Sequence, residues 1–400
     1  MKKHLLLPLM VVVTSFSAGA QQSSAPVSLM QLAKLTVSDG SVDTQFGKTM
    51  AASGNTLVAN HGSEVYVFVK PSAGWSDSTE SALLVPSNGT AAFLAAAVSG
   101  NVVAVSATEA NQVGDVYVFV RPSGGWSGNV TETAILGDRS QSCFGSTIGI
   151  SSNTIAVGTG GAGAFGFGNC IFVMPAGGWK NAIHADATLT VPLNATDLGT
   201  PLAISGDVVV VGVPGNFEAE GTLYVFVKPA GGWSGALNPT AILIASDGRP
   251  EEGLGSAVGI SGNTVVATSS NILGQGKVYI FVEPTSGWVD MTETAQLKSP
   301  PNAIAYALSV AVSGNIVAVG APLTTVGFNQ LQGTAYVYLM PQGGWKTTTK
   351  FNAQLVSTDG APNDNFGTGL AIGGGNIFAG APFATIGSNS LEGAAYVFGQ

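Results

Sequence analysis

The sequence predicts an all-β protein, a seven-bladed β-propeller of four-stranded antiparallel blades. Three observations predict it. The phrase Pro-x-Gly-Gly-Trp, or a near copy, recurs six times and contains all six tryptophans, spaced 51 to 57 residues apart. Apolar runs with the composition of strands surround each copy, and a repeat of about fifty residues of this kind is typical of propellers. The last unit stops after three strands, while a spare strand precedes the first unit.

The first two strands of each unit are expected to form a hairpin. A Ser-Gly-Asn turn lies between two apolar runs at 53–55, 99–101, 261–263 and 313–315, with Ser205-Gly206-Asp207 as a close variant. Glycine and asparagine tolerate the positive φ that two-residue hairpin turns require. The turn therefore joins adjacent antiparallel strands.

The third and fourth strands follow in a fixed order. The third is an aromatic alternating run such as Val65-Tyr66-Val67-Phe68, rich in residues that favour strands. Proline comes shortly after it and ends the strand, because proline has no N–H to donate to a ladder. The fourth carries Ala-x-Leu, in seven copies from Ala33-Lys34-Leu35 to Ala353-Gln354-Leu355.

The chain ends predict a closed ring. The last unit ends at Tyr396-Val397-Phe398, after its third strand, and residues 32–37 supply a spare fourth strand. We expect this N-terminal strand to complete the C-terminal blade, which would remove exposed sheet edges. Residues 32–400 are then a single propeller domain, preceded by a short segment at 21–31.

The first twenty residues have the pattern of a secretory signal peptide. Lys2 and Lys3 precede an apolar run at 5–13, and Ala18-Gly19-Ala20 provides a small-residue cleavage site. We expect cleavage after Ala20 and a secreted or periplasmic protein. The apolar run is shorter than the roughly 20 residues that cross a bilayer, so no membrane span is expected.

Composition argues against one class of partner. The formal net charge is −9, only 9% of residues are charged, and the 14 basic residues form no cluster. Nucleic-acid binding needs a basic footprint that neutralises phosphates, so we expect none.

Two short motifs carry a family resemblance. Phe46-Gly47, Phe144-Gly145 and Phe366-Gly367 open units, and Gly320-Ala321-Pro322 and Gly380-Ala381-Pro382 close second strands. With seven units in order, residues 32–400 resemble the FG-GAP repeat proteins, of which integrin α chains are the best known. The resemblance implies a seven-bladed propeller that functions in binding or adhesion. Four units depart from the first motif, for example at Tyr306-Ala307.

No cofactor is expected. Calcium-binding members of the family carry a D-x-D-x-D-G-x-x-D loop, and here only the Ser-Gly-Asn turn occupies that place. Acidic residues do recur between blades: Asp39-Gly40 with Asp43, Asp247-Gly248 with Glu251 and Glu252, and Asp359-Gly360 with Asp364. Calcium takes six to eight oxygens, more than each loop's side chains offer. A tight Asp-Gly turn with a later capping Asp is the favoured interpretation.

Catalytic residue types are scarce. Outside the signal sequence the histidines are His61 and His184, and no G-x-S-x-G elbow is present. A glycosidase could work with paired carboxylates alone. The carboxylates considered for that role are Glu132, Glu218, Glu220, Glu251 and Glu293. We expect no enzyme activity.

Cys143 and Cys170 are the two cysteines. A disulfide would suit an oxidising compartment. However, the strands expected to carry them are separated by one intervening strand, about 9.6 Å in ladder spacings, and bridged Cα atoms lie within roughly 7 Å. A disulfide and two free thiols both remain open.

The tryptophans are expected to serve packing, and the variable loops are expected to serve binding. A residue that recurs at one repeat position usually serves the repeated packing, so the tryptophans are expected at the seams between blades. The loops between second and third strands vary, and rigid scaffolds present binding residues on such loops. Phe328 and Phe383 are the candidate contact residues; the alternative is that both pack their own loops down.

The predicted function is that of an exported, non-catalytic and monomeric propeller. Its expected partner is an extracellular protein or glycan, bound through the loop face. The alternatives are a hydrolase or lyase acting on extracellular polysaccharide, and a purely structural envelope protein.

Overall fold

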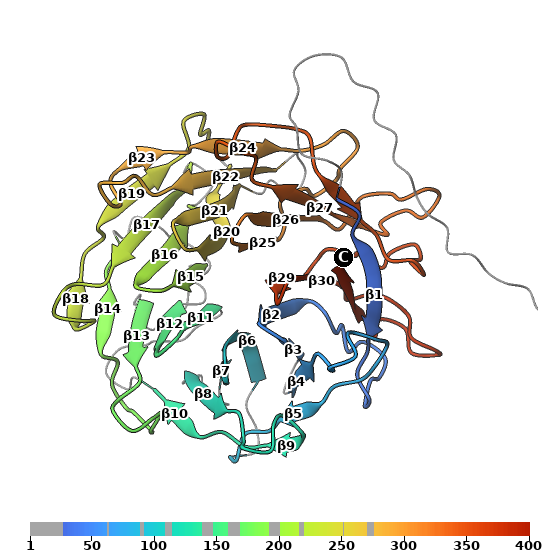
Figure 1. The fold of residues 1–400 in the computed structure, drawn as a ribbon, viewed down its shortest axis with the longest axis horizontal. Helices are drawn as coiled ribbons and strands as arrows, with labels where there is room; N and C mark the ends of the chain where they lie inside the picture. Colours follow the sequence, from blue (N-terminus) through green and yellow to red (C-terminus); the bar gives the residue numbers. More distant parts are fainter. Residues whose placement is uncertain are drawn as a thin grey trace, which may run out of the picture.

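In the computed structural model the chain forms a ring of seven small sheets (Figure 1). The structure describes residues 27–61, 64–88, 92–108, 114–137, 147–158, 169–191, 201–215, 220–250, 252–269 and 276–400. All regular elements in these ranges are strands. Within them, no helix is long and apolar enough to cross a bilayer.

Each sheet is one blade, and its strands follow one another from the centre of the ring to its rim (Figure 1). The first three blades are β2 (Thr49–Ser53), β3 (Thr56–His61), β4 (Glu64–Val69) and β5 (Ala82–Leu84); β6 (Ala92–Ser99), β7 (Val102–Thr108), β8 (Gly114–Val120) and β10 (Ala134–Leu136); and β11 (Thr147–Ser151), β12 (Thr154–Gly158), β13 (Asn169–Val173) and β14 (Ala187–Leu189). Blades 4 and 5 are β15 (Leu202–Ser205), β16 (Val208–Val213), β17 (Thr222–Val227) and β19 (Ala241–Ile244), then β20 (Leu254–Ser261), β21 (Thr264–Ser269), β22 (Lys277–Val282) and β24 (Ala295–Lys298). Blades 6 and 7 are β25 (Val310–Ser313), β26 (Ile316–Ala321), β27 (Thr334–Leu339) and β28 (Ala353–Leu355), then β29 (Leu370–Gly373), β30 (Asn376–Ala381), β31 (Ala394–Gly399) and β1 (Met30–Leu35).

The two ends of the described chain meet in blade 7. Strand β1 pairs antiparallel with β31, with Leu35 opposite Ala395 and Met30 opposite Gly399. The N-terminal strand thus completes the last blade, as the sequence predicted. This pairing closes the ring.

The sequence had suggested four-stranded, purely antiparallel blades, but three of the seven sheets have a fifth strand that pairs in parallel. The segment after each tryptophan pairs in parallel with the outer strand of the preceding blade. In three blades it forms a fifth strand: β9 (Gly128–Val130) beside β5, β18 (Gly235–Leu237) beside β14, and β23 (Met291–Thr292) beside β19. Elsewhere it forms single bridges: Leu35 with Ser78, Leu136 with Ala182, and Leu297 with Thr348. We call this segment, which follows each tryptophan and pairs with the outer strand of the preceding blade, the strap.

The tryptophans that begin these straps are buried at the seams. All six are at most 9% exposed. Each belongs to an apolar cluster that mixes two neighbouring blades; Trp126, for instance, packs with Val58 of blade 1 and Val103 of blade 2. The prediction that they serve packing is confirmed. Burying so large an apolar side chain is among the strongest single contributions to a core.

The Phe-Gly and Gly-Ala-Pro motifs also join blades. Gly380 of blade 7 lies against the carbonyl of Gly47, at the entrance to blade 1, so closely that no Cβ would fit. Gly320 lies in the same way against Gly367. Gly47 and Gly367 both have φ of 91°, a conformation that favours glycine. The glycines therefore allow two backbones to approach each other across a seam.

The Ser-Gly-Asn turns make a third set of contacts between blades. The serine hydroxyl of one turn accepts a hydrogen bond from a backbone N–H in the next turn. The five bonds run from Gly100 to Ser53, Ser152 to Ser99, Gly206 to Ser151, Gly262 to Ser205 and Gly314 to Ser261, at 2.9–3.2 Å. The recurrent serine thus fastens neighbouring inner strands.

Candidate functional site

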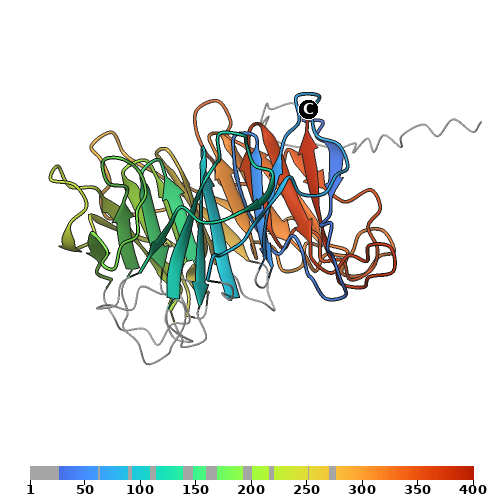
Figure 2. The same cartoon turned by 90° about the horizontal axis from the view of Figure 1, so that it is seen from below.

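We call the side that carries the loops between second and third strands, together with the connections between blades, the loop face. Figure 2 shows the long orange and red loops projecting from it, away from the C-terminus, which lies on the opposite side. The described loops are 322–333 in blade 6 and 382–393 in blade 7. They lie against the connections 356–369 and 36–48, respectively.

The two long loops are built as copies of each other. Backbone N–H and carbonyl groups of Val326 and Asn329 bond reciprocally at 3.1 and 3.0 Å, and Ile386 and Asn389 do the same at 3.1 and 2.9 Å. Gly327 and Gly387 have φ near +60° at the first position of each turn. Each loop therefore ends in a tight, closed turn.

The loop stems are fixed to the neighbouring connections. Phe366 N–H donates to the Gln332 carbonyl at 2.7 Å, and Phe46 N–H donates to the Glu392 carbonyl at 2.8 Å. Side chains repeat the arrangement. Asn329 donates to Gln332 and to the Gly360 carbonyl, while Asn389 donates to Glu392 and to the Gly40 carbonyl.

The loop tips differ where the stems agree. Phe328 occupies the tip of the blade 6 loop and is completely exposed, at 102% of the reference area. The matching tip residue in blade 7 is Ser388, which is also exposed. Leu331 and Leu391, at matching positions of the two stems, are each 38% exposed. An aromatic side chain on a closed turn is thus fully available for contact with a partner.

Phe383, the second candidate contact residue, is placed differently. It lies at the start of the blade 7 loop, is partly buried, and donates its backbone N–H to the Asp364 carbonyl at 3.4 Å. The two phenylalanines therefore do not form one pair of tips. Phe328 is the more accessible of the two.

The recurrent acidic residues between blades have structural partners. Asp39 accepts a hydrogen bond from the Tyr66 hydroxyl at 3.1 Å, and Asp247 accepts one from Tyr279 at 2.9 Å. Asn88 takes the matching position in blade 2 and donates to Tyr117 at 2.7 Å. Each turn thereby anchors to a third-strand tyrosine.

These tyrosines and carboxylates influence each other's ionisation. Burial, with hydrogen bonds to Glu64 and Asp39, raises the pKa of Tyr66 well above its ordinary value. Burial opposes ionisation of Asp247, but hydrogen bonds from Lys277 and Tyr279 outweigh it and lower the Asp247 pKa. The Asp359 pKa is lowered similarly: burial opposes the shift, and Lys34, 2.6 Å away, overcomes it. Tyr279 therefore stays a neutral donor to the charged Asp247.

In the connection 356–369, between blades 6 and 7, the second acidic residue caps a turn. Asp364 is 5% exposed and accepts the Ala361 N–H at 2.7 Å. Thr44 occupies the matching place and accepts the Ser41 N–H at 2.9 Å. The favoured interpretation of an Asp-Gly turn with a capping residue therefore holds here. Among the described residues, no group of three or more His, Cys, Asp or Glu could hold a metal ion.

Two of the carboxylates considered for catalysis instead accept hydrogen bonds from a serine in a connection between blades, and so hold neighbouring blades together. Glu132 accepts both the N–H and the hydroxyl of Ser87, the N–H at 2.9 Å, and Glu293 accepts the same pair from Ser246 at 2.8 and 2.6 Å. Glu80 does the same with Ser38. Glu220 is exposed, and Glu218 and Glu251 lie outside the described residues. Sequence analysis did not predict these serine–glutamate hydrogen bonds. The signals that could have indicated them are the recurring Ser-Asp/Asn-Gly turn and the Glu two residues before Ala-x-Leu.

The remaining candidates are dispersed. Cys170 is fully buried in β13, where it is disulfide-bonded and not a free thiol. Cys143 lies outside the described residues. His61 ends β3 on blade 1, and His184 lies in the strap of blade 3.

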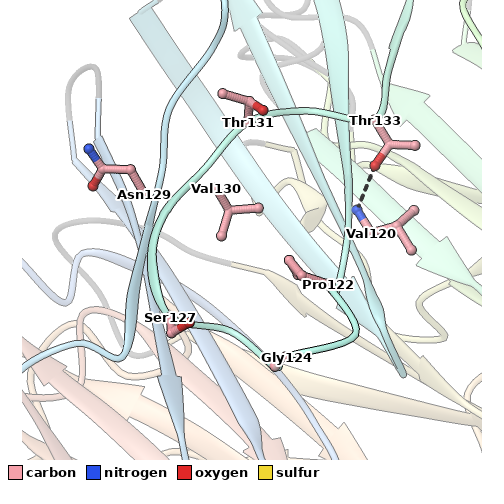
Figure 3. A pocket seen from close by; sticks show the side chains of 9 residues that line it. Val120, Pro122, Gly124, Ser127, Asn129, Val130, Thr131 and Thr133 are labelled. Carbon is pink, nitrogen blue, oxygen red and sulfur yellow. Dashed lines mark hydrogen bonds between the residues drawn. The ribbon is translucent and has the colours of Figure 1, made fainter.

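A hollow of about 390 Å³ lies in blade 2, away from the long loops (Figure 3). One stretch of chain lines it, from Val120 to Thr133, and the Thr133 hydroxyl accepts the Val120 N–H at 3.2 Å. Its polar side chains are neutral, among them Ser127, Asn129 and Thr131. The strap itself creates this hollow.

Comparison with known protein families matches one unit of the chain. The FG-GAP repeat family matches residues 349–398, the unit that contains Phe366-Gly367 and Gly380-Ala381-Pro382. Among curated proteins, none matches the chain. One similar solved structure is Hsv2 from Kluyvelomyces marxianus, with 10% identity, a TM-score of 0.44, and coverage of 76% of this chain and 82% of that one.

Proposed function

We propose that the chain, one unit of which matches the FG-GAP repeat family, is an exported, non-catalytic propeller that binds a protein or glycan through its loop face. One observation carries the proposal. Phe328 is completely exposed on a closed turn whose stem is hydrogen-bonded to the next connection. A large apolar side chain gains free energy when a partner covers it, so a fixed, exposed aromatic tip favours binding.

The contrast between the two long loops supports this assignment. Their stems keep the same bonds, while the tip residue changes from Phe328 to Ser388. The fold needs only the turn at this place, since serine serves equally well in blade 7. The phenylalanine is therefore free to serve recognition.

Export rests on the N-terminal pattern. Lys2 and Lys3, the apolar run at 5–13 and the small residues before Gln21 favour a signal peptide cleaved after Ala20. Sequencing the mature N-terminus tests this directly. A protein that begins at Gln21 supports export, and a mature protein that begins at Met1 contradicts it.

The binding proposal is tested by screening the purified mature protein against a glycan array and against extracellular and cell-envelope protein fractions. Phe328→Ser copies the blade 7 tip and should abolish the interaction found, at unchanged melting temperature. Ile183→Ser is the matched control, because Ile183 is 59% exposed on the strap of blade 3. Equal binding by Phe328→Ser would overturn the assignment of Phe328, and turnover of a glycan would favour the enzyme alternative.

A further inference from the structure

Leu331 and Leu391, at matching positions in the stems of the two long loops, have a backbone conformation that disfavours leucine. Their φ angles are 55° and 57°, in the left-handed region, where the Cβ of an L residue crowds the following carbonyl oxygen. Two positions later the same stems use glycine, with φ of 86° at Gly333 and 87° at Gly393. Glycine or asparagine would adopt the conformation of the two leucines with less strain. The backbone therefore does not account for the choice of leucine.

Packing does not account for the two leucines either. Each is 38% exposed. Among the described residues, Leu331 is not part of the apolar cluster between blades 6 and 7, and Leu391 is not part of the cluster between blades 7 and 1. Recurrence in two repeats usually indicates a packing role, but these side chains remain outside the core. Strain that is retained at an exposed position is typical of functional sites.

The two leucines extend the exposed apolar surface around Phe328. The connection 356–369 is hydrogen-bonded to both long loops, through Gln330 on one side and Phe383 on the other, so it joins them (Figure 2). Exposed apolar side chains come from both loops and from the two connections that flank them: Phe328, Leu331, Leu391, Val42 and Ile304. The exposed apolar side chains of this sector therefore extend from blade 6 to blade 1.

The charged side chains that are exposed in this sector are mainly acidic. In residues 36–48, 322–333, 356–369 and 382–393 they are Asp39, Asp43, Asp359 and Lys48. The other two carboxylates of these segments, Asp364 and Glu392, are buried. A partner surface with lysine or arginine around an apolar centre is complementary to this arrangement.

Building on the proposed function of the loop face, we propose that its partner is a protein, and that Leu331 and Leu391 determine this specificity together with Phe328. The complementary surface is apolar at its centre and carries lysine or arginine at its rim. A glycan fits the two leucines poorly, because hydroxyl groups buried against leucine lose their hydrogen bonds to water and gain none. Protein interfaces, in contrast, combine an apolar core with a polar rim.

The first test measures stability and needs no partner. Asparagine tolerates the left-handed conformation, so Leu331→Asn and Leu391→Asn should leave the melting temperature of the mature protein unchanged or raise it. Asn363→Leu is the matched control, because Asn363 is exposed and has φ of 70°; leucine there should lower the melting temperature through strain. A lower melting temperature in either of the first two variants would show that leucine packs its own loop, and would overturn the proposal.

The second test measures binding of a fluorescent amphipathic peptide of leucine and lysine to the full mature protein, with an all-lysine peptide of equal length as the charge control. Fluorescence anisotropy should show saturable binding of the leucine–lysine peptide. The double variant Leu331→Asn/Leu391→Asn should bind it at least about tenfold more weakly. Ile183→Ser, at a position that is 59% exposed outside the loop face, should bind it like the parent.

Three results of this titration overturn the proposal: no saturable binding, equal binding of the two peptides, or equal binding by the double variant. The glycan and protein screen separates this proposal from the proposed function. A glycan whose binding Phe328→Ser abolishes would keep the loop face as the site but overturn the protein partner. Equal binding by Phe328→Ser in that screen would overturn the assignment of the loop-face site itself.

Discussion

The indole N–H of Trp75 donates a hydrogen bond of 3.1 Å to the side-chain oxygen of Asn376, across the seam where the first and last blades meet. The same indole packs edge-on against Phe378 of blade 7, with ring centroids 5.5 Å apart. The other five indole N–H groups are buried without a hydrogen-bond partner among the described residues. At the seam that closes the ring, the tryptophan therefore forms a hydrogen bond in addition to its apolar contacts. The other five tryptophans form no indole hydrogen bond among the described residues.

Asn376→Ala should destabilise the protein by about 1–3 kcal/mol, because it leaves a buried donor unsatisfied. Urea unfolding measures the change. A double-mutant cycle with Trp75→Phe isolates the bond, and a coupling near zero would contradict its role.

Trp233→Ala should destabilise folding by about 3–5 kcal/mol, because it empties a seam in which Trp233 is only 5% exposed. Chemical denaturation provides the value, with exposed Ile183→Ser as the control. Loss of ligand binding at an unchanged melting temperature would instead place this tryptophan in a binding site.

Gly320→Ala should destabilise the protein by about 1–3 kcal/mol, since a Cβ there would collide with the Gly367 carbonyl oxygen. Gly231→Ala is the matched control, because a Cβ at Gly231 meets nothing within 4 Å. Equal stability of the two variants would show that the glycine contact between blades 6 and 7 is unimportant.

Asp364→Asn should stabilise the protein at neutral pH. Burial raises the Asp364 pKa above its unfolded value, so the charged form is disfavoured in the folded state. The contribution of this group is most favourable below the unfolded pKa and is lost as pH rises through the folded pKa. Denaturant midpoints should therefore differ at neutral pH and converge in acid. Thr44→Val, at the matching uncharged position, should show no such convergence, and a pH-independent difference for Asp364→Asn would contradict the explanation.

The repeats made the fold and the burial of the tryptophans at the seams predictable, but the parallel pairing of each strap with the preceding blade did not follow from them. Ala-x-Leu and Val-Tyr-Val-Phe are periodic within one blade, so strand order and ring closure could be read from the chain. The strap from Trp126 to β5 joins two units, and local periodicity contains no signal for a parallel partner in another unit. The sequence offered Phe328 and Phe383 alike as contact residues, with packing against their own loops as the alternative. It could not separate them, because the full exposure of Phe328 and the partial burial of Phe383 beside the connection at Asp364 depend on tertiary contacts.

The most direct test of the loop-face account compares parent protein and Phe328→Ser in the same glycan and protein screen, with the melting temperature measured on the same samples. The account predicts that the interaction is lost while the melting temperature stays the same. Retained binding by Phe328→Ser would contradict it. So would reproducible glycan turnover that a single carboxylate substitution on the loop face abolishes.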